Sequence, residues 1–380
     1  MREGWTYKKL GEVATFINGD RGKNYPSQKD FVDNGIPFIN AGHIMNGEID
    51  FDSMNYITEK KYNSLNSGKV IDGDILFCLR GSLGKKAIVK GVTQGAIASS
   101  LVIIRCNDVY NQYLFHYLNS SFISSCIYKS NNGSSQPNLS ATSVSGYIIP
   151  IPPLSEQQSI VAELDKINEL ISLKKAQLSD LDSLAQSIFY DMFGDPIENE
   201  KGWEVKKLSD VSTLLNGRAY KQNELLNEGK YKVLRVGNFF TNSNYYYSNL
   251  ELEDNKYCDY GDLLFAWSAS FGAFIWSDEK VIYHYHIWKV LYDESYLNKL
   301  YYCYLLNTMT NSFMNDLHGI GMMHLTKVGM EQYILPLPPL PLQQEFAKRI
   351  ELIEQQKTQI SSTIKDLETL LASRMQYWFD

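Results

Sequence analysis

Residues Tyr147–Leu164 read YIIPIPPLSEQQSIVAEL, and residues Tyr333–Ile350 read YILPLPPLPLQQEFAKRI. Both stretches contain a short apolar run, then several prolines, then a pair of glutamines that opens a second apolar pattern. Proline interrupts the hydrogen-bonding ladder of a sheet but is tolerated in the first turn of a helix. Each stretch therefore predicts a strand that ends at the prolines and a helix that begins near the glutamines, 186 residues apart.

Three further blocks repeat in the same order. GWTYKKLGEVATFING (Gly4–Gly19) matches GWEVKKLSDVSTLLNG (Gly202–Gly217) at an offset of 198. VIDGDILFCLRGSLGKKAIV (Val70–Val89) matches the segment around Gly261 at an offset of 188, and the words YLN and LLN follow at the same offset. Collinear blocks with a slowly shrinking offset indicate a duplicated domain with small deletions in its loops.

The duplication predicts two similar domains, each followed by a long helix. The predicted parts are a first domain over 1–152, a first spacer helix over 153–195, a second domain over 196–338 and a second spacer helix over 339–380. Within each domain, short runs of Tyr, Phe, Ile and Val are broken by Gly, Asn, Asp and Ser, which is typical of strands and turns. Helical stretches intervene. We therefore predict an α+β fold, with two globular domains joined by two long antiparallel coiled-coil helices in a pseudo-twofold arrangement.

The segments after the prolines carry apolar residues at alternating spacings of four and three, the pattern of a coiled-coil seam. The predicted seam residues are Ile160, Leu164, Ile167, Ile171, Leu178, Leu181, Ile188, Phe346, Ile350, Ile353, Ile360, Ile364, Leu367 and Leu371. Lys357 interrupts the second series, where it could set the register or meet an acidic residue. Ser155 followed by Gln158 predicts a capping box, and Gly194 predicts the end of the first helix.

The charge is distributed unevenly along the chain. The net charge is −7 over 380 residues, but residues 155–200 alone carry 3 basic and 10 acidic groups. Residues 1–150 carry 15 basic and 12 acidic groups, so an acidic pI does not exclude an anionic ligand for the domains. The acidic segment suits a protein partner or solvent better than DNA. With no apolar leader and no long apolar run, we expect a cytoplasmic protein without a membrane span.

Motifs of well-known catalytic sites are not found in the sequence. It contains no GxxxxGK[ST] loop, no GxGxxG after a strand and no GxSxG. The five scattered cysteines have no metal-ligand spacing. His284 and His286 are expected on one face of a strand, where packing is more common than metal binding. The carboxylates of DGD (Asp72–Asp74) and of YGD at Asp262 are expected in turns before strands. We predict neither a catalytic set nor a metal site.

Taken together, these blocks resemble the specificity subunit of type I restriction-modification systems. The resemblance rests on GWxxxKLGEV, on GDILF (Gly73–Phe77), on SLG (Ser82–Gly84), on GSSQPNLS (Gly133–Ser140) and on the proline-rich hinge with its helix. It covers essentially the whole chain, twice. It implies two target recognition domains that read a bipartite site in double-stranded DNA. The implied partners are two methyltransferase subunits and the restriction subunits. Catalysis, S-adenosylmethionine and ATP with magnesium would then belong to those partners.

Candidate DNA contacts follow from side-chain chemistry, since Arg reads guanine, Asn and Gln read adenine, and Lys and Arg bind phosphates. For the first domain the candidates are Arg21, Lys23, Arg80, Ser82, Lys85, Lys86, Gln136 and Asn138. For the second domain they are Arg218, Tyr220, Lys221, Trp267, Ser268, Ser270, His324 and Lys327. Tyr245–Tyr247 fits either a DNA clamp or a strand at a sheet edge.

Two other functions remain open from the residues alone. The chain could be a diverged DNA methyltransferase or nuclease with its own reading domains, which predicts activity without a partner. It could also be a coiled-coil scaffold with no role at DNA, which predicts that no methyltransferase accompanies it. The divergence of the second domain, with AWSASFG (Ala266–Gly272) in place of CLRGSLG, makes the transfer of site residues to that half less direct.

Overall fold

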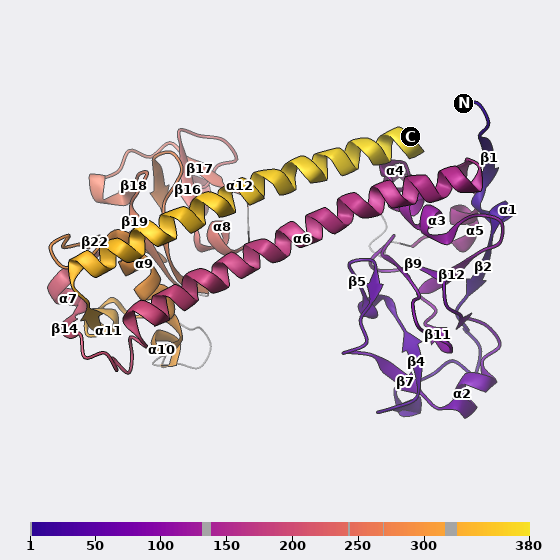
Figure 1. Cartoon of the computed structure of the whole chain (residues 1–380), viewed down its shortest axis with the longest axis horizontal. Helices are drawn as coiled ribbons and strands as arrows, with labels where there is room; N and C mark the ends of the chain where they lie inside the picture. Colours follow the sequence, from indigo (N-terminus) through magenta and orange to yellow (C-terminus); the bar gives the residue numbers. More distant parts are fainter. Residues whose placement is uncertain (1, 131–137, 242–243, 269, 316–324) are drawn as a thin grey trace. The chain divides into compact units, whose positions relative to one another are not determined.

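The computed structural model describes residues 2–130, 138–241, 244–268, 270–315 and 325–380. They form two compact units, one of Met1–Lys175 with Ser362–Asp380 and one of Ala176–Ser361. The boundary falls within two 40-residue helices, α6 (Leu154–Phe193) and α12 (Leu340–Phe379), so each unit contains part of both (Figure 1). Within the described ranges, no helix combines the length and apolar character that crossing a membrane requires.

The first unit contains a four-stranded sheet of order β10-β9-β12-β2 and a five-stranded sheet of order β3-β7-β4-β11-β8. Two strand pairs, β1-β13 and β5-β6, accompany them. The strands are β1 (Thr6–Lys9), β2 (Ala14–Asn18), β3 (Phe31–Val32), β4 (Ile36–Ile39), β5 (Ile44–Met45), β6 (Glu48–Ile49), β7 (Asn55–Ile57), β8 (Lys69–Val70), β9 (Ile75–Cys78), β10 (Lys86–Ile88), β11 (Gly95–Ile97), β12 (Leu101–Cys106) and β13 (Ile148–Ile151). The helices are α1 (Leu10–Val13), α2 (Glu59–Ser64), α3 (Asn111–Leu118), α4 (Ser121–Ser130) and α5 (Ala141–Ser145), with 3-10 turns η1 (Gln28–Asp30) and η2 (Ala41–His43).

The second unit contains two four-stranded sheets, β15-β22-β19-β20 and β17-β16-β21-β18, and the pair β14-β23. The strands are β14 (Glu204–Lys207), β15 (Ser212–Asn216), β16 (Tyr231–Leu234), β17 (Tyr246–Ser248), β18 (Tyr257–Cys258), β19 (Leu263–Ser268), β20 (Ser270–Ile275), β21 (Val281–Tyr283), β22 (Ile287–Tyr292) and β23 (Ile334–Leu337). The helices are α7 (Leu208–Val211), α8 (Val236–Phe240), α9 (Lys299–Thr308), α10 (Thr310–Asn315) and α11 (Lys327–Glu331), with 3-10 turns η3 (Gln222–Glu224) and η4 (Asp254–Lys256).

The two units share one strand order. The sheet β10-β9-β12-β2 corresponds to β20-β19-β22-β15, and β7-β4-β11-β8 corresponds to β17-β16-β21-β18. In both units one central pair is parallel, β4 with β11 and β16 with β21. The predicted α+β class and the internal duplication are confirmed.

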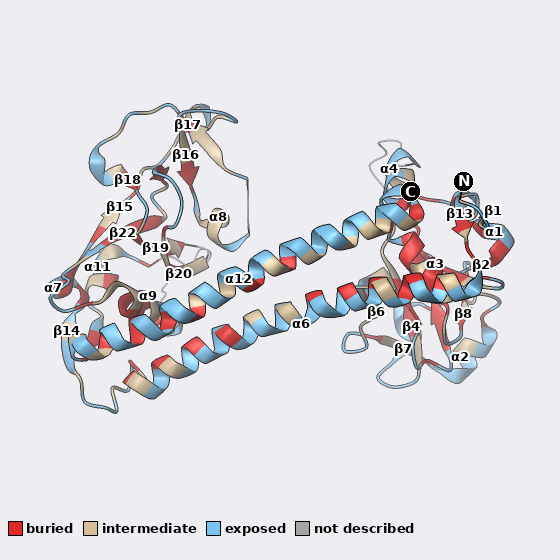
Figure 2. Cartoon of the chain, turned by 45° about the horizontal axis from the view of Figure 1, so that its top comes forward, coloured by how far each residue is buried: buried red, intermediate tan, exposed pale blue. Residues whose placement is uncertain are grey.

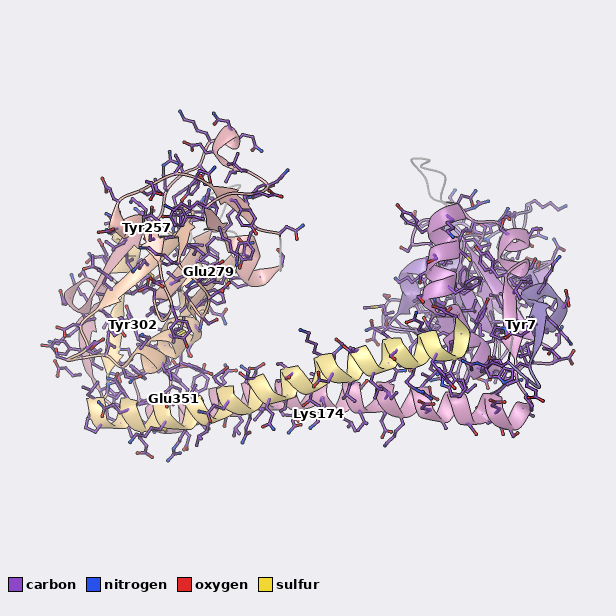
Figure 3. The ribbon with its side chains drawn as sticks, turned by 90° about the horizontal axis from the view of Figure 1, so that it is seen from above. Tyr7, Lys174, Tyr257, Glu279, Tyr302 and Glu351 are labelled. Carbon is purple, nitrogen blue, oxygen red and sulfur yellow. The ribbon has the colours of Figure 1, made fainter. Side chains whose placement is uncertain are left out.

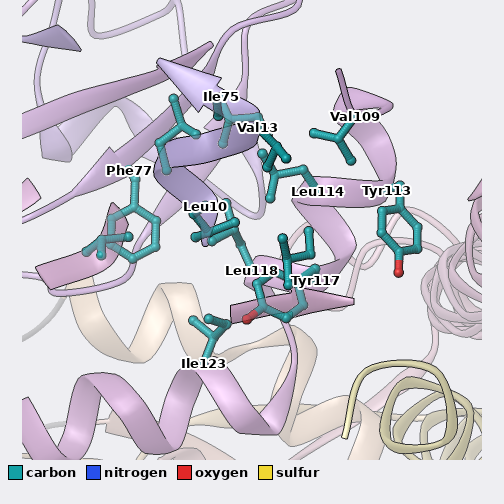
Figure 4. Close-up of a cluster of buried hydrophobic side chains, with 14 of the residues drawn as sticks. Leu10, Val13, Ile75, Phe77, Val109, Tyr113, Leu114, Tyr117, Leu118 and Ile123 are labelled. Atoms are coloured by element: carbon teal, nitrogen blue, oxygen red, sulfur yellow. The ribbon is translucent and has the colours of Figure 1, made fainter. Parts of the chain in front are cut away.

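The core of the first unit joins its sheet to its helices. Leu10 of α1, Phe77 of β9 and Leu114 of α3 are fully buried together (Figure 4). Leu164 of α6 belongs to the same cluster. Each large apolar side chain buried in this way contributes roughly 1.5–3 kcal/mol relative to exposure. The first turns of the long helix are therefore part of the domain core.

The carboxylates of DGD (Asp72–Asp74) and of YGD at Asp262 lie in turns just before strands β9 and β19, as predicted. Gly73 adopts a φ of 84°, which favours glycine, and the Asp74 carboxylate accepts the Ile71 N–H at 2.9 Å. Asp74 also binds Arg105 of β12 at 2.8 Å. In the second unit Asp262 has the corresponding partner, Lys289 of β22, at 2.6 Å.

A buried glutamine holds the start of α6 on its domain. Gln157 is 3% exposed; its Nε2 donates to the Pro152 carbonyl at 2.9 Å, and its Oε1 accepts the Tyr110 N–H at 2.9 Å. The Tyr113 hydroxyl donates to the Pro150 carbonyl at 2.8 Å. A buried backbone polar group must be hydrogen-bonded, and these side chains satisfy the carbonyls of the proline-rich segment.

The second unit repeats this junction. Gln343 is fully buried; its Nε2 donates to the Pro338 carbonyl at 2.8 Å, and its Oε1 accepts the Asn298 N–H at 2.8 Å. The Tyr301 hydroxyl donates to the Pro336 carbonyl at 2.9 Å. The glutamine is therefore repeated because one buried amide closes the same junction in each unit.

The capping box predicted at Ser155 and Gln158 is wrong. The helix begins earlier, at Leu154, and both residues lie exposed inside the helix. The N–H groups of Glu156 and Gln157 donate to the Pro153 carbonyl at 2.9 and 3.0 Å, so proline precedes the helix. The predicted end is confirmed, since α6 stops at Phe193 and Gly194 follows with a φ of 75°.

The predicted seam residues of α6 and α12 lie on their less exposed faces, and buried positions recur along both helices (Figure 2). Ile160, Leu164, Phe346 and Ile350 are at most 1% exposed. The half-buried members of the series are Leu178, Ile188, Leu367 and Leu371. The burial follows the heptad period that the sequence carries.

Ion pairs join the two helices within each unit. In the first, the Arg374 guanidinium binds Glu163, with Nη2 to Oε2 at 2.9 Å, and Lys175 binds Glu368 at 2.8 Å. In the second, Lys357 binds Asp182 at 2.7 Å. In the first unit the numbers rise on α6 while they fall on α12, so the segments run antiparallel. Figure 3 shows the side chains along both helices, with Lys174 on α6 and Glu351 on α12.

The C-terminal end of each helix packs on a tyrosine. Phe379 of α12 contacts Tyr113 of α3 with ring centroids 5.4 Å apart, and Phe193 of α6 contacts Tyr301 of α9 at 4.7 Å. These tyrosines are the ones that bind the proline-rich carbonyls. Each unit therefore fastens the start of one long helix and the end of the other at the same place.

The buried glutamine provides a stability test. In Gln157→Ala, the Tyr110 N–H and the Pro152 carbonyl lose their partner inside the protein, at a cost of about 1–3 kcal/mol. We expect a lower urea midpoint and faster hydrogen exchange at the Tyr110 amide. The control is Gln158→Ala, since the neighbouring glutamine is exposed. Equal behaviour of the two variants would contradict the role of Gln157.

Candidate nucleic-acid interface

Three loops of the first unit meet where strands of its two sheets end, β4 and β11 of the five-stranded sheet and β9 of the four-stranded sheet. The parallel strands β4 and β11 end together, with Ile39 opposite Ile97, and the Ala98 N–H donates to the Ile39 carbonyl at 2.7 Å. The Leu79 N–H, just after β9, donates to the Ser100 carbonyl at 2.8 Å. We call this group the first loop edge; it comprises Asn40, residues 79–80 and residues 98–100.

The second unit forms the same edge. Leu234 of β16 lies opposite Tyr283 of β21, and the His284 N–H donates to the Leu234 carbonyl at 2.9 Å. The Trp267 N–H, near the end of β19, donates to the His286 carbonyl at 3.1 Å. The second loop edge comprises Arg235, residues 267–268 and residues 284–286. Each hydrogen bond has its counterpart in the first unit.

Three predicted contacts of the first domain line one pocket of about 250 Å³. They are Arg21, Arg80 and Asn138. Arg80 and Asn138 form an antiparallel backbone bridge, and the Arg21 guanidinium donates to the Ser99 carbonyl at 3.4 Å. The structure thus brings together residues from three separate segments. The remaining candidate of this group, Gln136, lies outside the described residues.

Asp20 shapes the loop that carries Arg21 and Lys23. Its side chain is 6% exposed and accepts the N–H groups of Gly22 at 2.7 Å and of Asn66 at 2.8 Å. These hydrogen bonds hold the pKa of the Asp20 carboxyl below its ordinary value. Lys23 is exposed beside this fixed turn.

Lys85 and Lys86 lie elsewhere. They line a cavity of about 1120 Å³ with residues of α3, α4, α6 and α12. The Lys85 Nζ donates to the Ala41 carbonyl at 3.1 Å, and the Lys86 Nζ donates to the Leu118 carbonyl at 2.6 Å. Burial lowers the pKa of Lys86 to about 8. Ser82, which lies between Arg80 and Lys85 in the sequence, is exposed. The structure does not bring these lysines to the pocket of Arg80.

In the second domain, Arg218 is bound internally. Its guanidinium forms two hydrogen bonds to the Glu224 carboxylate, at 2.9 and 2.8 Å. The pair raises the pKa of Arg218 and lowers that of Glu224 to about 2. Burial raises the pKa of Tyr220, whose ring lies over His284 with centroids 6.3 Å apart. Lys221 is exposed.

The other predicted contacts of the second domain do not all lie in one place. Ser268 and Ser270 line a pocket of about 1100 Å³, and Trp267 stacks on Trp288 with its Nε1 donating to the Tyr285 carbonyl at 2.9 Å. Lys327 begins α11 and pairs with Glu331 at 3.6 Å. His324 lies outside the described residues.

The pocket also contains residues that the sequence did not single out as contacts. They are Arg235 and Asn238, which line it together with His284 and with Tyr246, a residue that the sequence did offer as part of a possible DNA clamp. Arg235 follows β16 as Asn40 follows β4, and the Arg235 N–H donates to the Asn238 side chain at 2.7 Å as the Asn40 N–H binds His43 Nδ1 at 3.2 Å. A repeat at an offset of 195, FINAGHI against VLRVGNF, is the signal that could have found them.

The strand predicted for His284 and His286 is wrong. His284 pairs with Arg218 as an isolated bridge, and Tyr285 and His286 form the turn between β21 and β22, which the Ile287 N–H closes on the His284 carbonyl at 3.0 Å. Burial, with smaller contributions from His286 and Arg235, lowers the pKa of His284 to about 4. Among the residues that the structure describes, no three His, Cys, Asp or Glu side chains are grouped to hold a metal ion. Tyr246 lies in β17, an edge strand, which confirms the strand at a sheet edge that was one of the two predictions for Tyr245–Tyr247.

Comparison with known proteins identifies relatives over nearly the full length. The family model described as "Type I restriction modification DNA specificity domain" matches residues 2–182 and 200–369. The chain is 26% identical to the type I restriction enzyme MjaIX specificity subunit of Methanocaldococcus jannaschii, over 91% of this chain and 86% of the relative.

Two solved structures have the same fold. One, described as the structural basis of complex assembly and conformational transition of the type I R-M system, gives a TM-score of 0.63 at 21% identity and covers 99% of this chain and 97% of that one. The other, the type I restriction-modification system S subunit from M. genitalium, gives 0.55 at 13% identity and covers 99% and 96%.

The turn at Asp20 provides a test of the first loop group. In Asp20→Ala, the amides of Gly22 and Asn66 lose a charged acceptor, so we expect their hydrogen exchange to accelerate at least tenfold. Because the folded-state pKa is lowered, the stabilisation is complete above the unfolded pKa of about 3.9 and is lost as the pH falls through the folded value. Exchange in Asp33→Ala, which alters an exposed aspartate, should match the unsubstituted protein. Unchanged protection in Asp20→Ala would contradict the assignment.

Proposed function

This chain belongs to the family of type I restriction modification DNA specificity domains, and we propose that it reads a split DNA target, one half with each unit. The first loop edge and its neighbours Arg21 and Asn138 read one half. The second loop edge and the pocket beside it read the other. The two halves are different sequences, because the side chains at corresponding places differ.

One observation carries this proposal: the same loop edge is built twice, and each copy has an exposed arginine. Arg80 and Arg235 are both exposed. Within the described residues, neither guanidinium has a carboxylate within ion-pair distance. Arginine donates in a planar fork that matches base edges and phosphates, so an arginine left without an acid is suited to a nucleic acid.

Affinity for the phosphate backbone is proposed to come from lysines beside the edges. Lys23 and Lys221 occupy corresponding places, each five residues after the end of its strand, β2 or β15, and both are exposed. Lysines near phosphates release counterions on binding, and they contribute affinity without sequence preference. The reading residues and the phosphate-binding residues are thus distinct sets.

The partners are proposed to be two modification subunits and, in the nuclease, restriction subunits. The relative from Methanocaldococcus jannaschii is a specificity subunit of a type I restriction enzyme, and one structural neighbour concerns complex assembly. Leu184 on α6 and its repeat counterpart Leu370 on α12 are 48% and 45% exposed. Equivalent exposed leucines on both helices support two copies of the same partner.

Catalysis is proposed to reside in those partners. S-adenosylmethionine would bind the modification subunits, and ATP with magnesium would bind the restriction subunits. This chain would contribute recognition and assembly. Purified alone, it should show neither methyl transfer nor S-adenosylmethionine binding by calorimetry; binding of that cofactor by the chain itself would instead support a methyltransferase with built-in reading domains.

Mapping of methylated adenines tests the two-reader proposal. We expect the full chain, expressed with its modification subunit in a host free of adenine methylation, to place N6-methyladenine in a split motif. Replacing residues 1–152 by the first domain of another specificity subunit should change one half of the motif and leave the other. A continuous motif, or a motif unchanged by the exchange, would contradict the proposal.

The phosphate contacts are tested by salt dependence. Lys23→Ala and Lys221→Ala should each weaken binding of the assembled complex to every DNA sequence alike. The slope of log binding constant against log salt should fall by about one for each. Lys166→Ala, on α6 and paired with Glu169, is the matched control and should leave the slope unchanged. A slope that stays constant in both test variants would remove these lysines from the interface.

A further inference from the structure

We propose that Arg235 is the guanine-reading residue of the second domain, and that it replaces, from a different loop, the arginine that the first domain carries at Arg80. The inference rests on the proposed function, DNA recognition. It goes further by naming the residue, the base and the loop.

The second domain offers few alternatives. Residues 196–338 contain two arginines, Arg218 and Arg235. Arg218 has both terminal nitrogens on Glu224, at 2.9 and 2.8 Å. To reach a base, Arg218 would have to give up both charge-assisted hydrogen bonds of this bidentate pair, so we assign it a structural role. Arg235 is left.

Arg235 is placed and oriented for contact. It directly follows β16 at the second loop edge, it is exposed, and it lines the pocket of about 1100 Å³. Its guanidinium lies over the ring of Tyr246, 5.2 Å from the centroid. Stacking on an aromatic face holds the guanidinium plane without using its N–H donors. No ion pair engages it within the described part of the chain.

The first domain shows the complementary arrangement. Asn40 follows β4 at the place of Arg235, and Arg80 follows β9 at the place of Ser268. The backbone hydrogen bonds that join the loops are the same in both units. One arginine is therefore present at each edge, but it comes from the loop after β9 in the first domain and from the loop after β16 in the second.

The chemistry of the arginine selects the base. Guanine presents two acceptors, N7 and O6, to the major groove, and the arginine fork can donate to both at once. Adenine offers one acceptor and one donor there, so it cannot satisfy the fork. Lysine is a point charge on a flexible stem and lacks the rigid planar fork that holds the two bonds parallel.

The test uses the full chain with its modification subunit, and it maps methylated adenines in the genome of a host without other adenine methylation. In Arg235→Ala and Arg235→Lys, we expect one guanine position in the second half of the motif to accept other bases. The preference at that position should fall roughly five- to hundredfold. The first half should stay unchanged and serves as the internal control for folding and assembly. Arg80→Ala should loosen only the first half.

The outcomes separate the inference from the function on which it rests. An unchanged motif in Arg235→Ala would overturn the inference while the split motif still supported two readers. A uniform loss of methylation at all sites, with the base preference kept, would make Arg235 a phosphate contact and would also overturn it. If the unsubstituted chain directed no split motif, the proposed function itself would fall, and the inference with it.

Discussion

Each unit depends on one buried amide where a domain meets a long helix. Residues 147–153 and 333–339 each contain three prolines, which have no N–H donor, and the carbonyls of Pro152 and Pro338 are buried. Gln157 in the first unit and Gln343 in the second each satisfy one of those carbonyls. Each also accepts the N–H of the residue just before a domain helix, Tyr110 before α3 and Asn298 before α9. The helix therefore leaves the domain in a direction that side-chain hydrogen bonds define. Leu164 and Phe346, buried beside the domain cores, add the apolar part of the same junction.

While the junction is the same in both units, the side chains of the loop edges differ between them. The loop edges keep their backbone hydrogen bonds in both units, while the side chains at corresponding places differ: Asn40 against Arg235, and Arg80 against Ser268. Because the backbone is held by strand pairing rather than by those side chains, a substitution there alters recognition at little cost in stability. A scaffold of this kind suits a protein that must read two different sequences.

Much of the fold could be predicted from the sequence because duplication and period are properties of residue order. The α+β class, the repeat and the end of α6 at Phe193 follow from such patterns. The capping box was wrong because Ser155 fits the motif locally, whereas the helix begins one residue earlier, where the N–H groups of Glu156 and Gln157 donate to the carbonyl of Pro153, outside the motif. The partners of charged side chains could not be predicted either: Arg218 matched the loop of Arg21, and the structure shows that Glu224, six residues further on, binds it. Arg235 was missed because its repeat block shares little but one glycine.

The central claim is that the two units are equivalent readers built on one scaffold. The most direct measurement replaces residues 196–338 by a second copy of residues 1–152 and maps the adenines methylated by the resulting chain with its modification subunit. The account predicts a split motif in which the original first half occurs twice and the original second half is lost. A motif that keeps the second half, or one in which the first half still occurs once, would contradict it.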